Sequence, residues 1–356
     1  VCYFTNWAQY SQFDTGLVDP FLCTHILYAF GKLVGTQIQD IEWNDQTIQA
    51  EVIALKNTNP NLKVLLAIGG WTADNSQYVN LVASQTNMVT FSSNAISYLR
   101  QRGFDGLDLD WEYPGNTDRG STSADRARFT QWIQILQNSF IAEAQQTGKA
   151  RLLLTAATAA SMPQANSYYE ISKLGNYLDF VNIMTYDFHG QWDGPSLGAQ
   201  HHSALYPEVN SSVIGWINAG FPANKLALGM GAYGRGYKLS AQPNGNGVGA
   251  QPNGYDMQKY SKICSKLNTG HSVVQLTNQQ AVAAVGQTNG QWEWIGFDNT
   301  DTFQSKARFI IANGLAGSMV WSLDQDDATN ACGGGKYPLL SVLQNMLPGY
   351  VFALSI

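Results

Sequence analysis

The feature that most constrains the fold is the recurrence of eight short apolar segments with longer amphipathic segments between them. The apolar segments are VCYFTNW from residue 1, THILYAF from 24, KVLLAIGG from 63, FDGLDLDWE from 104, RLLLTAATAA from 151, LDFVNIMTYD from 178, KLALGMGAYG from 225 and AGSMVWSLD from 316. Most of them lack a two-residue alternation of apolar and polar side chains. That pattern is typical of parallel strands that are covered on both faces.

The amphipathic segments carry helical periodicity. Apolar residues recur at intervals of three or four between residues 88 and 102, before Gly103, and again between 129 and 140, before Gly148. A glycine directly after such a stripe is a common helix stop. Eight strands that alternate with helices predict a (β/α)₈ barrel of the α/β class.

The interval between the seventh and eighth apolar segments is longer than one strand–helix unit needs. It contains a turn-rich stretch, SAQPNGNGVGAQPNGY from 240, and GQWEWIGFDN from 290, which alternates like an exposed strand. We therefore expect residues 237–300 to form a small α+β domain inserted after strand seven. The barrel would then comprise residues 1–236 and 301–356.

Composition excludes several classes of function. Hydrophobic residues make up 44% of the chain and charged residues 13%, which is typical of a globular protein. A net charge of −6 and a pI near 5.3 predict no binding to nucleic acid or to an anionic membrane. No apolar run is long enough to span a bilayer. The opening VCYFTNW is what we expect of a mature N-terminus after removal of a targeting peptide.

Cysteine and histidine usage bears on metal binding and on the cellular compartment. The four cysteines are Cys2, Cys23, Cys264 and Cys332, and none forms the close pairs of a zinc site. An even number fits two disulfides and an oxidising compartment, and four free buried cysteines are the alternative. A Cys264–Cys332 bridge would tie the insertion to the loop after strand eight. The five histidines also lack metal-ligand spacing, so we expect no metal.

The segment DGLDLDWE carries the strongest chemical signal. Because side chains alternate along a strand, Leu107, Leu109 and Trp111 share one face, and Asp108, Asp110 and Glu112 share the other. The apolar set is expected to face the helices and the acidic set the barrel interior. Burial of unpaired carboxylates is costly, so these groups should be protonated or hydrogen-bonded.

Two functional interpretations of this acidic face were weighed. An EF-hand loop that begins at Asp108 would place Tyr113 where glycine is needed and Arg119 where glutamate is needed, although another cation site stays open. General acid catalysis fits better, because Glu112 comes at the carboxyl end of strand four and Asp110 can share a proton with it. A protonated carboxyl at the mouth of a barrel is what cleavage of a glycosidic bond requires.

The segment DGLDLDWE also resembles the Asp-x-x-Asp-x-Asp-x-Glu signature of glycoside hydrolase family 18, which contains the chitinases and the chitinase-like lectins. The resemblance extends over the whole chain, through CYFTNW, LLAIGGW, MTYDFHG, YGRGY and MVWSLDQDD. It is greatest for the secreted animal chitinases, which also carry an inserted α+β domain.

The resemblance implies a catalytic role for four residues. Glu112 would protonate the glycosidic oxygen while the N-acetyl carbonyl of the substrate attacks the anomeric carbon, giving an oxazolinium ion that water opens with retention. Asp110 would orient the acetamide, and Asp108 would hold or share the proton of Asp110. Tyr186 would donate its hydroxyl to the acetamide oxygen.

The resemblance also implies a row of substrate-binding residues, because the C–H faces of sugars stack on aromatic rings. The expected residues are Tyr3, Trp7, Phe30, Glu42, Trp43, Gly70, Trp71, Thr72, Tyr113, Met184, Asp187, Tyr233, Arg235 and Trp321. Tyr3 would support the acidic row from beneath. One departure from many relatives is Ala67, where a serine would otherwise help to hold Asp108.

The resemblance therefore predicts a secreted, endo-acting chitinase that cleaves β-1,4-linked N-acetylglucosamine polymers. The alternatives are a chitinase-like lectin, which binds without cutting, and an endo-β-N-acetylglucosaminidase. The expected disulfides are Cys2–Cys23 and Cys264–Cys332. We expect a monomer whose partner is chitin or a chitooligosaccharide, without a cofactor.

Overall fold

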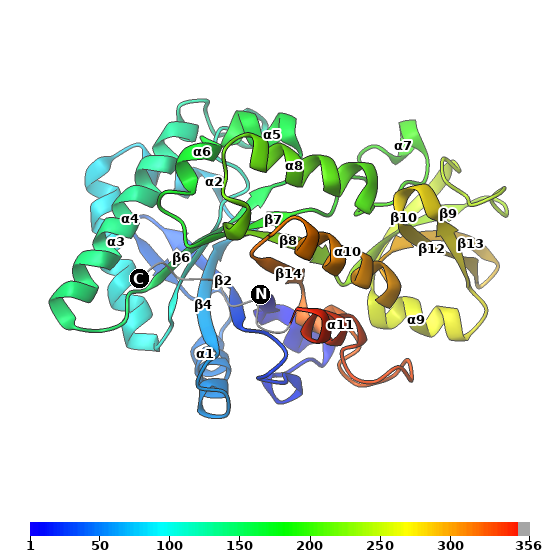
Figure 1. Ribbon diagram of the computed structural model, residues 1–356, viewed down its shortest axis with the longest axis horizontal. Coiled ribbons are helices and arrows are strands. Elements are labelled where there is room, and N and C mark those ends of the chain that lie inside the picture. Colours follow the sequence, from blue (N-terminus) through cyan, green and yellow to red (C-terminus); the bar gives the residue numbers. More distant parts are fainter. Residues whose placement is uncertain (348–356) are drawn as a thin grey trace.

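In the computed structural model, which describes residues 1–347, eight parallel strands form a closed barrel surrounded by helices (Figure 1). The barrel strands are β1 (Cys2–Thr5), β2 (His25–Val34), β4 (Lys63–Gly69), β5 (Gly106–Asp110), β6 (Leu153–Ala159), β7 (Phe180–Met184), β8 (Leu226–Gly231) and β14 (Gly317–Trp321). They pair in the order β1-β14-β8-β7-β6-β5-β4-β2, and β1 also pairs with β2, which closes the ring. The predicted (β/α)₈ barrel is confirmed, and each of the eight apolar segments contributes one strand.

Helices cover the outside of this barrel. They are α1 (Asp45–Ala54), α2 (Asn75–Val82), α3 (Gln85–Arg102), α4 (Asp125–Thr147), α5 (Met162–Tyr168), α6 (Ile171–Leu174), α8 (Asn210–Asn218), α10 (Thr300–Ala312) and α11 (Pro338–Met346). The short helix α7 (Gly194–Leu197) lies away from them, beside Tyr237 and Tyr255 (Figure 1). The two predicted stripes are α3 and α4. They end at Gly103 and Gly148, whose φ angles of 87° and 68° are left-handed and favour glycine.

The two faces of β5 point into different cores, as the alternation of its side chains predicts. Leu107, Leu109 and Trp111 belong to the large apolar cluster between the barrel and the helices. On the opposite face, Asp108 is 0% exposed and Asp110 is 3% exposed. The barrel interior therefore contains carboxyl groups at a position where most barrels place branched apolar side chains.

A second sheet follows β8 and lies at the right of Figure 1. Its antiparallel strands are β9 (Tyr233–Leu239), β10 (Pro252–Lys259), β11 (Ser272–Leu276), β12 (Ala281–Thr288) and β13 (Gln291–Phe297), accompanied by α9 (Tyr260–Asn268). This is the α+β insertion expected after the seventh barrel strand. That residues 237–300 act as a separate domain stays a prediction, and 348–356 of the predicted barrel range lie outside the described residues.

The expectation that the segment from residue 290 is an exposed strand is wrong. This segment forms β13, which pairs with β9 on one side and β12 on the other. Trp294 and Ile295 on opposite faces are both 0% exposed, because each face packs against its own apolar cluster. Glu293 and Gly296 interrupt the apolar residues of this segment, and the resulting alternation suggested that one face was exposed.

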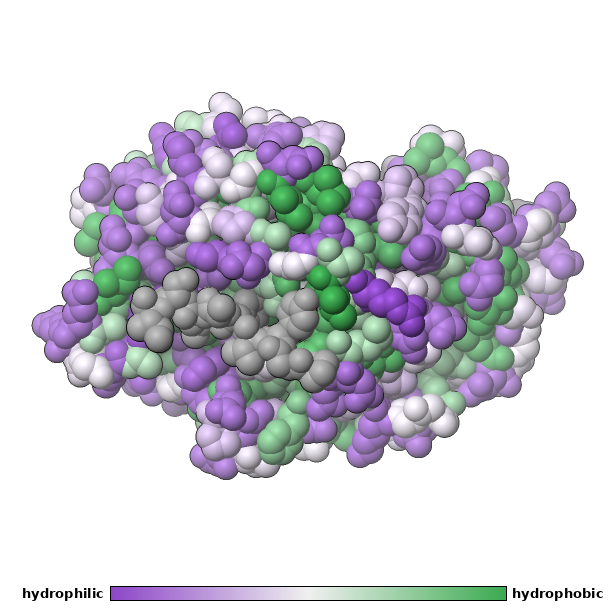
Figure 2. Space-filling view, in the orientation of Figure 1, coloured by the Kyte–Doolittle hydropathy of each residue, from purple (hydrophilic) through white to green (hydrophobic). Residues whose placement is uncertain are grey.

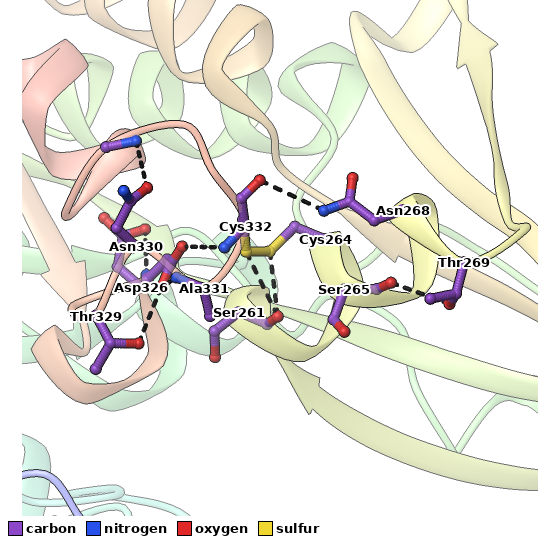
Figure 3. Close-up of a disulfide and its surroundings, with 12 residues drawn as sticks. Ser261, Cys264, Ser265, Asn268, Thr269, Asp326, Thr329, Asn330, Ala331 and Cys332 are labelled. Carbon is purple, nitrogen blue, oxygen red and sulfur yellow. Dashed lines mark hydrogen bonds between the residues drawn. A yellow bond between two sulfur atoms is a disulfide. The ribbon is translucent and has the colours of Figure 1, made fainter.

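Two disulfides, Cys2–Cys23 and Cys264–Cys332, join the pairs that were expected. Figure 3 shows Cys264 on α9 and Cys332 in the loop after β14, where Asn268 donates a hydrogen bond to the carbonyl oxygen of Cys332 at 3.4 Å. The carboxylate of Asp327 accepts the backbone N–H of Cys332 at 2.8 Å. The bridge therefore links the insertion to the barrel, and the alternative of four free cysteines is wrong.

Hydrophilic residues cover most of the face that Figure 2 shows, with smaller hydrophobic areas between them. Among residues 1–347, none of the helices combines the length and the apolar character that a membrane span requires.

Replacement of both Cys264 and Cys332 by serine should lower the free energy of unfolding by about 4 kcal/mol, since the bridge closes 68 residues. The Cys2–Cys23 bridge closes 21 residues. Replacement of both of these cysteines by serine should therefore lower the free energy of unfolding by about 3 kcal/mol. Thermal and denaturant unfolding of both variants measure the two losses. A larger loss for the shorter loop would contradict this account.

Candidate active site

The acidic residues lie at the carboxyl-terminal end of the barrel. β5 ends at Asp110 and Glu112 follows two residues later, while β7 ends at Met184 and β14 ends at Trp321. Because the strands are parallel, these ends meet at one rim. Residues far apart in sequence are thereby brought around one acidic row.

Asp108 is the deepest of the three acids and is held by hydrogen bonds. Its carboxylate accepts from the hydroxyl of Tyr3 at 2.7 Å, from Oγ1 of Thr155 at 2.5 Å and from Nδ2 of Asn182 at 3.3 Å. Burial raises the pKa of Asp108 to about 6, although these three donors act to lower it. Tyr3, which is 1% exposed, supports the row from beneath.

The sequence interpretation missed Thr155 and Asn182. Ala67 on β4 lies opposite Asp108, and Thr155 lies opposite it on β6, so a hydroxyl comes from the other neighbouring strand. Both missed residues left a signal, since each is a polar residue at an inward position within an apolar run. Such a residue in a barrel interior needs a hydrogen-bond partner.

Asp110 has the opposite environment. Its Oδ1 atom is buried without a hydrogen-bond partner in the described structure. Burial raises the pKa of Asp110 well above its usual range, and the nearby charges of Glu112 and Asp108 raise it further. The raised pKa favours the protonated form of Asp110, and its Oδ1 atom presents an acceptor that a bound molecule could satisfy.

Glu112 lies at the rim. Burial raises its pKa to about 7, while a hydrogen bond from Tyr113 and the charge of Arg119 act to lower it. The Arg119 guanidinium also stacks on the ring of Trp71 at 3.9 Å and donates to the Trp71 carbonyl oxygen at 2.5 Å. A carboxyl group with this pKa can donate a proton at physiological pH and accept it again.

Two glycines allow the chain to pass close to the acidic strand. The Gly70 N–H donates to the Asp110 carbonyl oxygen at 2.8 Å. A Cβ atom on Gly69 would lie 2.0 Å from that oxygen, and one on Gly70 would lie 2.6 Å from the ring of Phe30. The N–H of Gly70 thus holds the backbone at Asp110, and the absence of a side chain at Gly70 leaves room for this close approach.

An aromatic group lies beside the acids. The ring of Trp321 is 5.1 Å from Tyr3, 5.8 Å from Phe30 and 6.1 Å from Trp7, measured between centroids. Trp7 is 42% exposed, whereas Phe30 is 6% exposed and stacks against both tryptophans. Phe30 therefore supports the rings that remain accessible to a ligand.

A second group forms around Asp187. Its carboxylate accepts from the Tyr233 hydroxyl at 2.7 Å and from Nε of Arg235 at 2.8 Å. Burial acts to raise the pKa of Asp187, but His202 and Arg235 beside it hold that pKa below its usual range. Next to it, the Tyr186 hydroxyl donates to Sδ of Met319 at 3.9 Å, a weak acceptor that leaves it available to a ligand.

The remaining predicted residues lie around these two groups. Met184 packs partly buried against the barrel interior, and Tyr113 stacks on Tyr168 at 5.2 Å. Trp43 is 86% exposed and follows Glu42, whose carboxylate accepts from the Tyr10 hydroxyl at 2.5 Å. Trp71 is 60% exposed, and Thr72 beside it is also exposed.

Potential metal ligands come together at a different place in the structure. Within the described part of the chain, Cys264, Asp327 and Cys332 are the group whose atoms are close enough to hold an ion, and the two cysteines are bonded to each other. The acidic row of β5 does not form such a group there. A metal-free site stays a prediction.

A family model described as "Glycosyl hydrolases family 18" matches residues 1–326. This chain belongs to glycosyl hydrolase family 18. It is 40% identical to Chitotriosidase-1 of Mus musculus over 373 residues, which cover 98% of this chain and 77% of that protein.

Solved structures from the same family are also similar. An immunomodulatory active chitinase from Trichuris suis aligns with a TM-score of 0.90 at 32% identity, covering 97% of this chain and 98% of the other. Human YKL-39, described as a pseudo-chitinase with retained chitooligosaccharide binding, aligns with a TM-score of 0.89 at 31% identity, covering 97% and 98%. Since family 18 contains proteins of both kinds, catalysis has to be argued from the residues of the site.

In this family 18 chain, Asp110→Asn should stabilise the fold increasingly as pH rises. The folded-state pKa of Asp110 is raised, so the wild-type protein loses stability as pH rises above the unfolded value near 4. The variant carries no ionisable group there. It should match the wild type near pH 4 and be more stable than the wild type at pH 8. Denaturant unfolding at both pH values measures this, with the exposed Asp118→Asn as a control that should show no such trend.

Proposed function

We propose that this protein is a secreted, endo-acting chitinase that hydrolyses β-1,4-linked N-acetylglucosamine polymers by a retaining, substrate-assisted mechanism. The observation that carries the proposal is the pairing of two acids at the rim. Glu112 has a pKa of about 7, and Asp110 beside it has a buried Oδ1 that finds no partner among residues 1–347. The first can supply a proton, and the second can accept a substrate N–H.

In the first step, Glu112 transfers its proton to the glycosidic oxygen as the bond from that oxygen to the anomeric carbon breaks. The carbonyl oxygen of the substrate's own acetamide forms a bond to the same carbon, which gives an oxazolinium ion. Oδ1 of Asp110 accepts the acetamide N–H and stabilises the developing positive charge. Asp108, fixed by its three donors, holds or shares the proton of Asp110.

In the second step, water attacks the anomeric carbon from the face that the leaving group has vacated. Glu112, now a carboxylate, accepts the proton of this water, and the acetamide is regenerated. Two displacements at one carbon give retention of configuration. The protein supplies no nucleophile, so its task is to orient and polarise the acetamide.

The other groups of the site support this chemistry. The Tyr186 hydroxyl can donate to the acetamide oxygen, because its present acceptor is a thioether. Trp321 offers a ring face for the sugar at the cleavage point, with Met184 beneath the acetamide methyl. Asp187 and Arg235 provide hydrogen bonds to sugar hydroxyls beside it.

Two alternatives remain outcomes of the experiment. A lectin role is favoured by the likeness to a pseudo-chitinase, but both Asp110 and Glu112 are present in this chain. An endo-β-N-acetylglucosaminidase acts on branched glycans, whereas the exposed Trp7, Trp43 and Trp71 suit a long ribbon of sugars. The two disulfides support secretion into an oxidising compartment.

Incubation with an N-acetylglucosamine hexamer should give dimers and trimers by mass spectrometry. Glu112→Gln should lower kcat by at least about 100-fold and leave the hexamer Kd nearly unchanged, since it removes the proton and little of the surface. Glu51→Gln, on α1, is the control and should cut normally. An intact hexamer with wild-type protein would indicate the lectin. Equal cleavage of a fully deacetylated hexamer would refute the substrate-assisted mechanism.

The pH profile of kcat/KM should fall as pH rises through about 7, because Glu112 must be protonated to act. Arg119 acts to lower the pKa of Glu112, so Arg119→Gln should move this alkaline limb to higher pH. Initial rates of hexamer cleavage between pH 4 and 9 give the profile. An alkaline limb that stays at the same pH or moves to lower pH would show that Arg119 does not lower the pKa of Glu112.

A further inference from the structure

His202 is a fully buried residue in the segment between β7 and α8, and the roles proposed above do not use it. Its ring lies 4.8 Å from the ring of Tyr233 and is stacked on His201 at 5.6 Å, measured between centroids. A Cβ atom on Gly231 would lie 3.2 Å from Cε1 of His202. The His202 ring is therefore closely packed between Gly231 and the ring of Tyr233.

Both ring nitrogens of His202 have backbone partners. Nδ1 lies 3.3 Å from the backbone nitrogen of Asp187, and Nε2 lies 3.1 Å from the carbonyl oxygen of Tyr233. A backbone N–H can only donate and a carbonyl can only accept. Nδ1 also lies 3.5 Å from Oδ1 of Asp187, so this nitrogen faces both the backbone N–H and the carboxylate of that residue, while Nε2 faces the Tyr233 carbonyl oxygen.

The same residue holds an unusual turn after β7. Asp187 has a φ angle of 58°, which is left-handed and uncommon for a residue other than glycine. Next to it, the backbone N–H of Phe188 donates to the carbonyl oxygen of His202 at 2.9 Å. Two successive backbone N–H groups of this turn are thus bound by one residue.

His202 also contacts both of the elements that the Asp187 carboxylate joins. Asp187 follows β7, whereas Tyr233 and Arg235 belong to β9, and their side chains meet at that carboxylate. The imidazole forms a parallel link between the same two elements through their backbones. This link adds to the pairing of β7 with β8, and β7 ends three residues before Asp187.

We propose that His202 is a positioning residue that fixes Asp187, Tyr233 and Arg235 in the arrangement that binds the sugar chain. The inference rests on the proposed function for the identity of the ligand. Its effect should be seen in substrate binding more than in the chemical step, because none of the three residues transfers the proton.

The test uses three variants of the whole protein with the N-acetylglucosamine hexamer as the probe. The oxygen of an asparagine side chain lies where Nδ1 lies, so His202→Asn should still accept the Asp187 N–H and keep KM within about threefold of wild type. His202→Gln keeps a donor near the Nε2 position and loses that acceptor. His202→Gln and His202→Phe should each raise KM about tenfold, with kcat within about threefold.

His201→Phe is the matched control. His201 is equally buried and also bonds through both nitrogens, to the Phe297 carbonyl oxygen at 2.9 Å and to the Ser203 N–H at 3.0 Å, but it does not contact Asp187. Both phenylalanine variants should lower Tm, and only the one at residue 202 should raise KM. An equal rise in KM for His201→Phe, or an unchanged KM for both His202→Gln and His202→Phe, would overturn the inference.

The two proposals fail in distinguishable ways. A wild-type protein that does not cleave the hexamer refutes the proposed chitinase. The Kd of the hexamer, measured by calorimetry for the same variants, then decides the role of His202 by the same pattern of tenfold and threefold changes.

Discussion

The burial of three carboxyl groups on one face of a single strand is the constraint on which the site depends. Transfer of an ionised carboxylate from water into a protein interior costs several kcal/mol, even after the surroundings relax. Since Asp108, Asp110 and Glu112 share a face, their charges would also repel one another. The fold accommodates them by supplying donors to the deepest acid, and burial raises the pKa of all three, which favours their protonated forms.

The three acids differ in their hydrogen-bond partners and in their exposure, from the deepest residue to the rim. Asp108 has three donors and is fully enclosed. Asp110 has an oxygen that no group in the described part of the chain satisfies, and Glu112 is partly open to solvent. Unsatisfied buried polar groups are rare in folded proteins and call for an explanation. A ligand that brings its own N–H to Asp110 explains why this oxygen is left without a partner.

Much of this arrangement could be predicted from the sequence, and the reasons are local. The eight apolar segments, the glycine stops after α3 and α4, and the alternation in DGLDLDWE follow from geometry that a strand or helix carries in itself. The partners of Asp108 could not be predicted in this way. Thr155 and Asn182 lie on other strands, and the sequence alone does not specify the strand register that brings them to Asp108. The same limit applies to His202, whose link between Asp187 and Tyr233 depends on how β9 lies against the end of β7. The burial of β13 was missed because a sheet position is set by neighbours and not by the strand itself.

The second sheet grows directly out of the barrel. A single residue, Ala232, separates β8 from β9, and its N–H donates to the carbonyl oxygen of Trp321 at 2.8 Å while its own carbonyl accepts from the N–H of Tyr260 at 3.0 Å. Arg235, three residues further along β9, lies between two strands of this sheet, opposite Met257 of β10 and Gly296 of β13. The turn between β11 and β12 is different, because β12 is separated from β9 by β13, so insertions or deletions there can alter the outer edge of the sheet without changing the strands that flank Arg235.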